Sequence, residues 1–145
     1  MILADKKDYR QGYKKHFSAY KKLYECNANI NSRRLLLSYS VECGLKFLLL
    51  DKWHEENPQN ILANSNDLRK NVLGSHNLER ILRELGQQGA FKFPQLKTVH
   101  HDSVSSENYH QLCRYCIRLK EEDKLQDKMF EDELRKIACW IAERA

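Results

Sequence analysis

Residues 35–50, LLLSYSVECGLKFLLL, decide the fold class of this chain. We predict a helix over residues 30–54 that carries apolar side chains on nearly every side. Such a helix is typical of the middle of a bundle, where other helices cover all of its faces. Two charges, Glu42 and Lys46, interrupt the apolar run four residues apart, and at that spacing we expect them to form an ion pair.

Long helices are predicted on both sides of this segment. Over residues 4–26 the aromatic side chains recur at steps of three and four, which places them on one stripe that we interpret as core. Residues 125–144 have apolar residues at the same steps and are predicted to form an amphipathic helix that packs on the core. The aromatic stripe consists of Tyr9, Tyr13, Phe17, Tyr20 and Tyr24.

The middle of the chain is predicted to hold shorter helices joined by loops. Ser75 can cap a helix that ends at Gly86, and a second short helix is expected to end near Leu119. Residues 55–66 and 86–104 lack a clear period and are predicted as loops without a hairpin. These patterns together indicate an all-α fold.

Composition supports a single helical domain. The 145 residues are 41% hydrophobic and 31% charged, and the 5 glycines and 2 prolines are too few for a sandwich or barrel with many turns. No apolar run approaches the roughly 18–20 residues of a membrane span. The charged N-terminus lacks the apolar core of a signal peptide. We therefore expect a cytoplasmic protein with no membrane contact and with its 5 cysteines reduced.

Positive charge is concentrated at the start of the chain. The net charge is +5, and residues 1–25 carry seven lysines and arginines against three acidic residues. A lysine-rich helix of this kind is a surface on which a polyanion such as RNA can bind. Charge runs are more often simply solvated, and both interpretations stay open.

Known sequence motifs do not indicate a nucleotide fold, a hydrolase or a metal site. The chain has no GxGxxG, GxxxxGK[ST] or GxSxG sequence, so dinucleotide, P-loop and serine-hydrolase chemistry are not indicated. His110, Cys113 and Cys116 are three residues apart, and on a helix this spacing spreads the side chains too widely around one ion. We therefore predict no metal site and no cofactor.

Histidine and arginine side chains form the remaining candidate site. Metal-free RNA cleavage needs a base for the proton of a 2′-hydroxyl and a guanidinium that holds the phosphate as charge builds up. His76 and Arg114 are the main candidates, with Arg69 as a third. We place His76 in the first turn of the helix after Ser75, where the positive helix end attracts phosphate. Two alternatives stay open: a passive phosphate or nucleotide pocket, and a structural ion pair between Arg114 and Glu42.

Several segments of the chain, taken in order, resemble the HEPN superfamily. They are LLLSYSVECGLKFLLL with Glu42 and Lys46, GSHNLERIL with His76, CRYC with Arg114 and Tyr115, and ACWIAER near the end. The resemblance implies a single domain over residues 1–145 that forms a bundle of four to five helices with an up-and-down core. It also implies a homodimer with a composite pocket at its two-fold axis.

The resemblance also implies a function. Many members of the superfamily are metal-independent endoribonucleases of toxin–antitoxin, CRISPR-linked or phage-defence systems, and others only bind nucleotides or partner proteins. The first expectation is therefore a protein that acts on RNA, as an endoribonuclease of a toxin–antitoxin or phage-defence system. The alternatives are a non-catalytic nucleotide- or RNA-binding module, and a protein-interaction subunit of a defence complex whose partner is encoded nearby.

The resemblance also implies roles for individual residues at the positions that match the family. The family's ribonucleases carry an arginine followed, after a short spacer, by a histidine in a late helix. No histidine follows Arg114, whereas Arg69 and His76 have six residues between them. Arg114 would bind the phosphate, and His76 would move the proton. The residues expected to bind nucleotide or RNA are Tyr115, Arg118, His110, Lys46 and Glu42.

Overall fold

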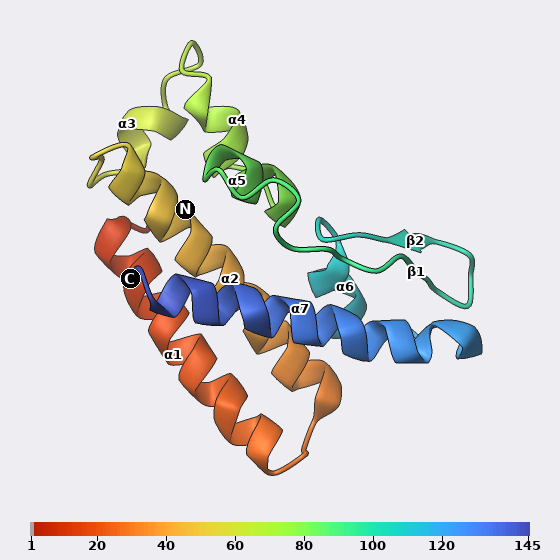
Figure 1. The fold of residues 1–145 in the computed structure, drawn as a ribbon. Helices are drawn as coiled ribbons and strands as arrows, with labels where there is room; N and C mark the ends of the chain where they lie inside the picture. The colour runs from red at the N-terminus through yellow and green to blue at the C-terminus, as the bar shows by residue number, and fades with distance from the viewer. Residues whose placement is uncertain (1) are drawn as a thin grey trace.

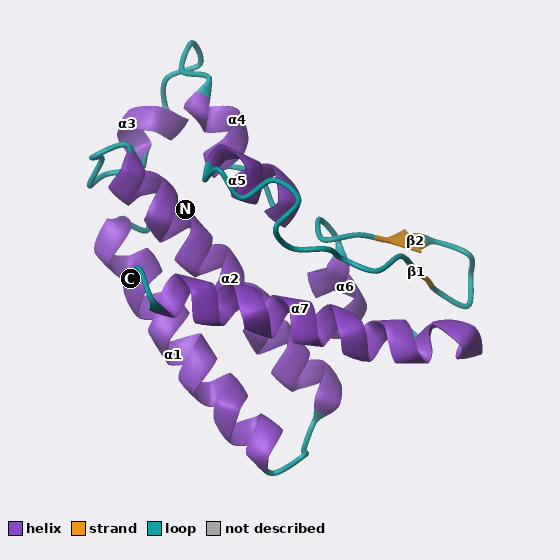
Figure 2. Ribbon diagram, viewed as in Figure 1, coloured by secondary structure: helices purple, strands orange, loops and turns teal. Residues whose placement is uncertain are grey.

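The computed structural model describes residues 2–145, and its helices confirm the predicted all-α class. Apart from the helices, these residues form one short antiparallel hairpin (Figure 2) and an isolated antiparallel bridge between Thr98 and Leu119. The helices are α1 Lys6–Glu25, α2 Ile30–Lys52, α3 Gln59–Leu62, α4 Arg69–Leu73, α5 Leu78–Glu84, α6 Tyr109–Arg114, the 3₁₀ helix η1 Glu121–Asp123 and α7 Lys124–Ala142. The strands of the hairpin are β1 Leu96–Lys97 and β2 Ser103–Val104.

Helix α2 lies at the centre of the molecule. Helices α1 and α2 form an antiparallel pair, and α7 crosses this pair (Figure 1). Helices α5 and α6 pack on other parts of α2, so four helices cover it. Leu37, Val41, Leu45 and Leu49 of α2 are completely buried. This confirms the prediction of a central apolar helix, and no helix within residues 2–145 has the length and apolar character needed to cross a membrane.

The first helix packs its aromatic stripe against this centre. Tyr13 and Tyr20 are buried, and Tyr9 and Phe17 pack against the core from its edge. Tyr24 is the exception, because it lies at the surface at the end of α1. The stripe is therefore core over most of its length, as the four- and three-residue spacing predicts.

The ion pair predicted within α2 is present. The Lys46 ammonium Nζ lies 3.7 Å from Glu42 Oε2. Lys46 is buried and Glu42 is half-buried, so each charge offsets part of the other's cost of leaving water. The second oxygen of Glu42, Oε1, lies 2.8 Å from Nδ1 of His76.

Helix α6 ends at Arg114 and not near Leu119 as predicted. In addition, two segments that were predicted as loops contain regular elements. Residues 55–66, predicted as a loop, contain α3, whose Ile61 is completely buried. The segment 86–104, predicted to lack a hairpin, contains β1 and β2, with Leu96 paired to Val104. In both segments apolar side chains are buried in the core, which the short, aperiodic sequence pattern does not indicate.

The helix that follows Ser75 begins later than predicted. Its N-cap is Asn77, whose Oδ1 accepts a hydrogen bond from the Arg80 backbone N–H at 3.3 Å. His76 therefore lies before the cap and not in the first helical turn, and the prediction of its placement there is wrong. Ser75 instead accepts a hydrogen bond from the Asn77 backbone N–H, which closes a short turn ahead of the helix.

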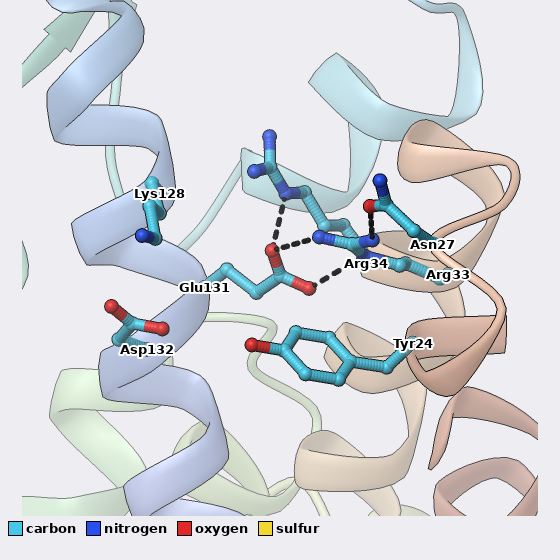
Figure 3. A pocket seen from close by; sticks show the side chains of 7 residues that line it. All are labelled: Tyr24, Asn27, Arg33, Arg34, Lys128, Glu131 and Asp132. Carbon is cyan, nitrogen blue, oxygen red and sulfur yellow. Dashed lines mark hydrogen bonds and ion pairs between the residues drawn. The ribbon is translucent and has the colours of Figure 1, made fainter. Parts of the chain in front are cut away.

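A buried cluster of charges joins α2 to α7. The Glu131 carboxylate, which is 1% exposed, accepts hydrogen bonds from Arg33 Nε at 2.9 Å and Nη2 at 3.0 Å, and from Arg34 Nε at 2.9 Å (Figure 3). Tyr20 of α1 donates to the same carboxylate at 2.8 Å. Burial alone would disfavour the charged form of Glu131, but the bonds from Arg33, Arg34 and Tyr20 outweigh it and lower its pKa.

The cluster continues into α6. Arg34 forms an ion pair with Asp127 of α7, and the Tyr109 hydroxyl donates to Asp127 Oδ1 at 2.7 Å. The Tyr109 ring also stacks on Phe130, with the ring centres 4.0 Å apart. These contacts hold the first residue of α6 against α7 and thereby set the position of the rest of that short helix.

Gly44 allows three helices to approach one another closely. A Cβ at this position would lie 2.8 Å from Tyr13 Cδ1 and 2.9 Å from both Cδ1 and Cγ2 of Ile141. Such distances are well inside van der Waals contact, so the crossing of α1, α2 and α7 needs a residue without a side chain here.

Replacing Glu131 by Gln tests the buried cluster. We expect the free energy of unfolding to fall by about 3–5 kcal/mol, because the change leaves the buried Arg33 guanidinium without a counter-charge and leaves Arg34 with Asp127 alone. Urea denaturation followed by circular dichroism measures it, and Glu143→Gln, at an exposed position of the same segment, is the matched control.

The effect of Glu131→Gln also depends on pH. Because the pKa of Glu131 is lowered in the folded state, the contribution of its charge to stability is present above the ordinary value of 4.5 and is lost as the pH falls through the lowered pKa. The two proteins should therefore converge in acid, and a constant difference would contradict the assignment.

Replacing Gly44 by Ala tests the close approach of the helices. At an exposed helical site this change stabilises by about 1 kcal/mol. Here we expect a destabilisation of about 1–3 kcal/mol, because the new methyl group overlaps Tyr13 and Ile141. Thermal denaturation measures the effect, with Ser18→Ala on the exposed side of α1 as the control. A stabilised Gly44→Ala protein would show that the helices can separate without cost.

Candidate functional site

A small hollow brings several of the predicted site residues together. It has a volume of about 160 Å³ and lies between α2, the turn before α5, and α6. Its walls are formed by Ser38, Tyr39, Glu42, His76, Leu78, Ser106, His110 and Arg114. His76 and Arg114, which are 38 positions apart in the printed sequence, therefore share one hollow together with His110 and Glu42.

His76 is held by the carboxylate of α2. Its Nδ1 lies 2.8 Å from Glu42 Oε1, while the other oxygen of Glu42 faces Lys46. A carboxylate only accepts hydrogen bonds, so Nδ1 carries a proton and the other nitrogen, Nε2, is the one that can exchange a proton with a ligand. The side chain of His76 is 60% exposed, so a ligand can reach the ring from solvent.

His110 lies beside His76. The centres of the two rings are 5.6 Å apart, and His110 is half-buried. Burial, followed by the neighbouring charge of His76 and that of Arg114, lowers the pKa of His110, while the Glu42 carboxylate acts in the opposite direction. The ring of His110 is therefore neutral at physiological pH and can accept a proton or a hydrogen bond.

Arg114 is held by a tyrosine. Its Nε donates to the Tyr39 hydroxyl at 3.2 Å, and its Nη2 donates to the same oxygen. The bond to Tyr39, with Tyr115 also beside the guanidinium, raises the pKa of Arg114, so the group stays charged. Within residues 2–145 no carboxylate forms an ion pair with Arg114. The alternative of a structural ion pair between Glu42 and Arg114 is therefore wrong, because Lys46 and His76 already occupy the Glu42 carboxylate.

Three other predicted residues lie outside the hollow. Tyr115 is 66% exposed and follows α6 directly, with its ring centre 5.9 Å from the guanidinium carbon of Arg114. Arg118 is exposed beyond α6, where its backbone oxygen accepts a hydrogen bond from Val99. Lys46 does not line the hollow, but it contacts the Glu42 carboxylate, which does.

Arg69 lies apart from the hollow. Its guanidinium bonds to Asp67, with Nη2 2.6 Å from Oδ2, and lies over the ring of Trp53 at 5.5 Å. The sequence spacing between Arg69 and His76 therefore does not translate into a shared site. The short helix α4 and the turn after it direct the two residues to different neighbours.

Sequence reasoning missed Tyr39 as a residue of the site. It belongs to the apolar run of α2 and looks like a core residue there. The available signal is its position three residues before Glu42, which places both side chains on the same face of the helix. His16 of α1 extends this face, because its ring lies 6.1 Å from that of Tyr39.

The histidine and cysteines of α6 do not converge. Cys113 is buried in the core, Cys116 is exposed in the turn after the helix, and His110 faces the hollow. Residues 2–145 contain no group of three or more His, Cys, Asp or Glu side chains arranged to hold a metal ion.

A larger hollow, of about 390 Å³, lies over the buried charge cluster (Figure 3). Its lining includes Arg33, Arg34 and Glu131, whose charged groups already bond to one another. Charged groups whose hydrogen bonds are already made to one another hold the helices together and leave little for a ligand to bind. The smaller hollow, where Arg114 has no carboxylate partner and His76 is open to water, is the better candidate for chemistry.

Comparisons with known proteins do not extend this assignment. No protein-family model, no curated protein and no solved structure matches this chain. The resemblance to the HEPN superfamily therefore stays a prediction, as do the homodimer and the partner protein.

The titration of His110 tests the electrostatics of the hollow. We expect His76→Gln to raise the pKa of His110, because it removes a neighbouring positive charge, and Glu42→Gln to lower it, because it removes a neighbouring negative charge. Nuclear magnetic resonance of the imidazole signals as a function of pH measures both shifts. His101→Gln, in the hairpin, should leave the titration of His110 unchanged. Shifts of the same sign in the two variants would contradict the arrangement.

Proposed function

We propose that this chain binds RNA at the hollow of His76, His110 and Arg114 and cleaves its phosphodiester backbone without a metal ion. One observation carries the proposal. Two imidazoles, one of them backed by a carboxylate, and a guanidinium without a carboxylate partner face the same small, water-accessible hollow. Side chains of these types supply what metal-free transesterification of RNA requires.

Each group has a chemical task in this reaction. The Arg114 guanidinium binds the non-bridging oxygens of the phosphate and balances the negative charge that grows on them. Tyr39 holds the guanidinium in place through its hydroxyl. An imidazole moves the protons between the ribose oxygens, and the Glu42 carboxylate fixes the orientation of the His76 ring. The attacking oxygen is the 2′-hydroxyl, so the proposal is specific to RNA.

The size of the hollow supports a phosphate and not a whole nucleotide. Its volume of about 160 Å³ is below the roughly 300–1,000 Å³ that is usual for pockets enclosing a small molecule. A phosphate and the edge of a ribose fit into such a space, and the bases remain outside. The exposed ring of Tyr115, next to Arg114, is a surface on which one of those bases can stack.

A second candidate is a passive site that binds RNA or a nucleotide phosphate. The exposed guanidinium of Arg114 favours it, since this group can hold a phosphate without any proton transfer. In either case we place the chain in the HEPN-like setting of a defence or toxin–antitoxin system. That assignment rests only on the sequence segments around Glu42, His76 and Arg114.

Incubation of the purified protein with total RNA in EDTA tests cleavage. We expect the wild-type protein to cut RNA but not DNA of the same sequence, and His76→Gln to reduce the rate by about 10²–10⁴-fold. Arg114→Ala should reduce it by at least about 10²-fold, because it removes the charge that stabilises the transition state. His101→Gln, at an exposed position away from the hollow, is the matched control and should retain full activity.

Other results of this experiment distinguish the passive site from cleavage. RNA that is retained by the wild-type protein in a salt-dependent manner and is never cut would support the passive site and contradict cleavage. Neither cutting nor retention under any condition would contradict both candidates.

A further inference from the structure

We infer that His110 accepts the proton of the attacking 2′-hydroxyl and that His76 donates a proton to the leaving 5′-oxygen. This inference rests on the RNA cleavage proposed above and assigns opposite roles to the two imidazoles. The sequence alone pointed to His76 as the group that moves the proton and to His110 only as a binding residue. The structure places the two rings side by side, so one phosphate can lie in reach of both.

The surroundings of His76 suit a proton donor. Its Nδ1 is bound to Glu42 Oε1 at 2.8 Å, so this carboxylate is placed to balance the charge of a doubly protonated ring. Lys46 contacts the other oxygen of Glu42, which keeps the carboxylate turned toward His76. The proton available for transfer is then the one on Nε2, and the 60% exposure of the side chain leaves room for a departing RNA fragment.

The surroundings of His110 suit a proton acceptor. Charged groups reach it from three elements: Glu42 from α2, His76 from the turn before α5, and Arg114 from its own helix. Arg114 is cationic, and so is His76 when it is protonated. A positive charge on His110 beside these two groups would be unfavourable. Partial burial acts in the same direction. A pair of titratable groups whose environments differ in this way is the usual arrangement for one acid and one base.

The step balances without any further reactant. The neutral ring of His110 takes the proton from the 2′-hydroxyl as the 2′-oxygen forms a bond to phosphorus. The bond between phosphorus and the 5′-oxygen breaks, and that oxygen takes the Nε2 proton of His76. The products are a 2′,3′-cyclic phosphate and a 5′-hydroxyl. At the end His110 is protonated and His76 is neutral, and exchange with water restores both.

Substitution of sulfur for one oxygen separates the two roles. The cleaved bond is first mapped on an RNA oligonucleotide, which is then made with sulfur in place of the 5′-bridging oxygen at that bond. A thiolate leaves without being protonated, so this substrate needs no proton donor but still needs an acceptor for the 2′-hydroxyl proton. The enzymes compared are the wild type, His76→Gln, His110→Gln and the control His101→Gln.

With the all-oxygen substrate we expect both His76→Gln and His110→Gln to lose about 10²–10⁴-fold in rate. With the sulfur substrate we expect His76→Gln to recover to within about tenfold of the wild type, while His110→Gln stays impaired. Glu42→Gln, which acts through His76, should recover with it. Circular dichroism of each variant establishes that it is folded before its rate is measured.

Each other outcome overturns the inference in its own way. Recovery of His110→Gln instead of His76→Gln would show that the roles are reversed. Loss of activity in both variants on both substrates would show that neither is a dedicated proton donor. In those two cases the wild-type protein still cuts RNA in EDTA and the proposed function stands. A wild-type protein that cuts neither substrate would overturn the proposed function together with the inference.

Discussion

Helix α2 has almost no side that can face water, and the rest of the structure follows from the need to cover it. Val41 and the leucines at 37, 45 and 48–50 are buried, and α1, α5, α6 and α7 each cover one part of its surface. Burial of apolar area is worth roughly 25 cal/mol per Å², so leaving any of these faces open would cost a large share of the stability of a small domain. This requirement brings the turn before α5 and the helix α6 onto the same edge of α2. The hollow lies at that edge, between segments that are distant in the sequence.

Glu131 and Glu42, two carboxylates of this framework, have different surroundings. Glu131 is buried and receives hydrogen bonds from Arg33, Arg34 and Tyr20, so both of its oxygens are fully used. Glu42 is half-buried, and its partners are one lysine at 3.7 Å and the exposed ring of His76. A saturated buried carboxylate stabilises the packing of helices and offers nothing to a ligand. A partly satisfied one at the surface can orient a histidine that faces water, which is the arrangement used to prepare an imidazole for proton transfer.

Helix α6 connects the buried charge cluster to the hollow. Tyr109 at its start bonds to Asp127 and stacks on Phe130, and so anchors the helix to α7. The next residue, His110, and Arg114 one turn later face the hollow. A helix of only six residues has little stability of its own, so its orientation depends on such anchoring. The charge cluster that fastens α7 to α2 therefore also determines how the imidazole and the guanidinium meet.

The sequence by itself determined the all-α class, the central position of α2, the aromatic core face of α1 and the ion pair between Glu42 and Lys46. These features depend on side-chain periodicity along a single helix, and such local spacing can be seen directly in the chain. Only the tertiary structure decided that His76 lies before its helix and that Arg114 donates hydrogen bonds to Tyr39 instead of pairing with Glu42. It also decided that Arg69 bonds to Asp67 and lies over the ring of Trp53. These contacts join segments whose relative orientation depends on turns and short helices, and no local pattern encodes that orientation. The buried cluster around Glu131 could not be predicted for the same reason. A glutamate in a charged stretch is normally expected to be solvated, and the two arginines that bury it here are distant in the sequence.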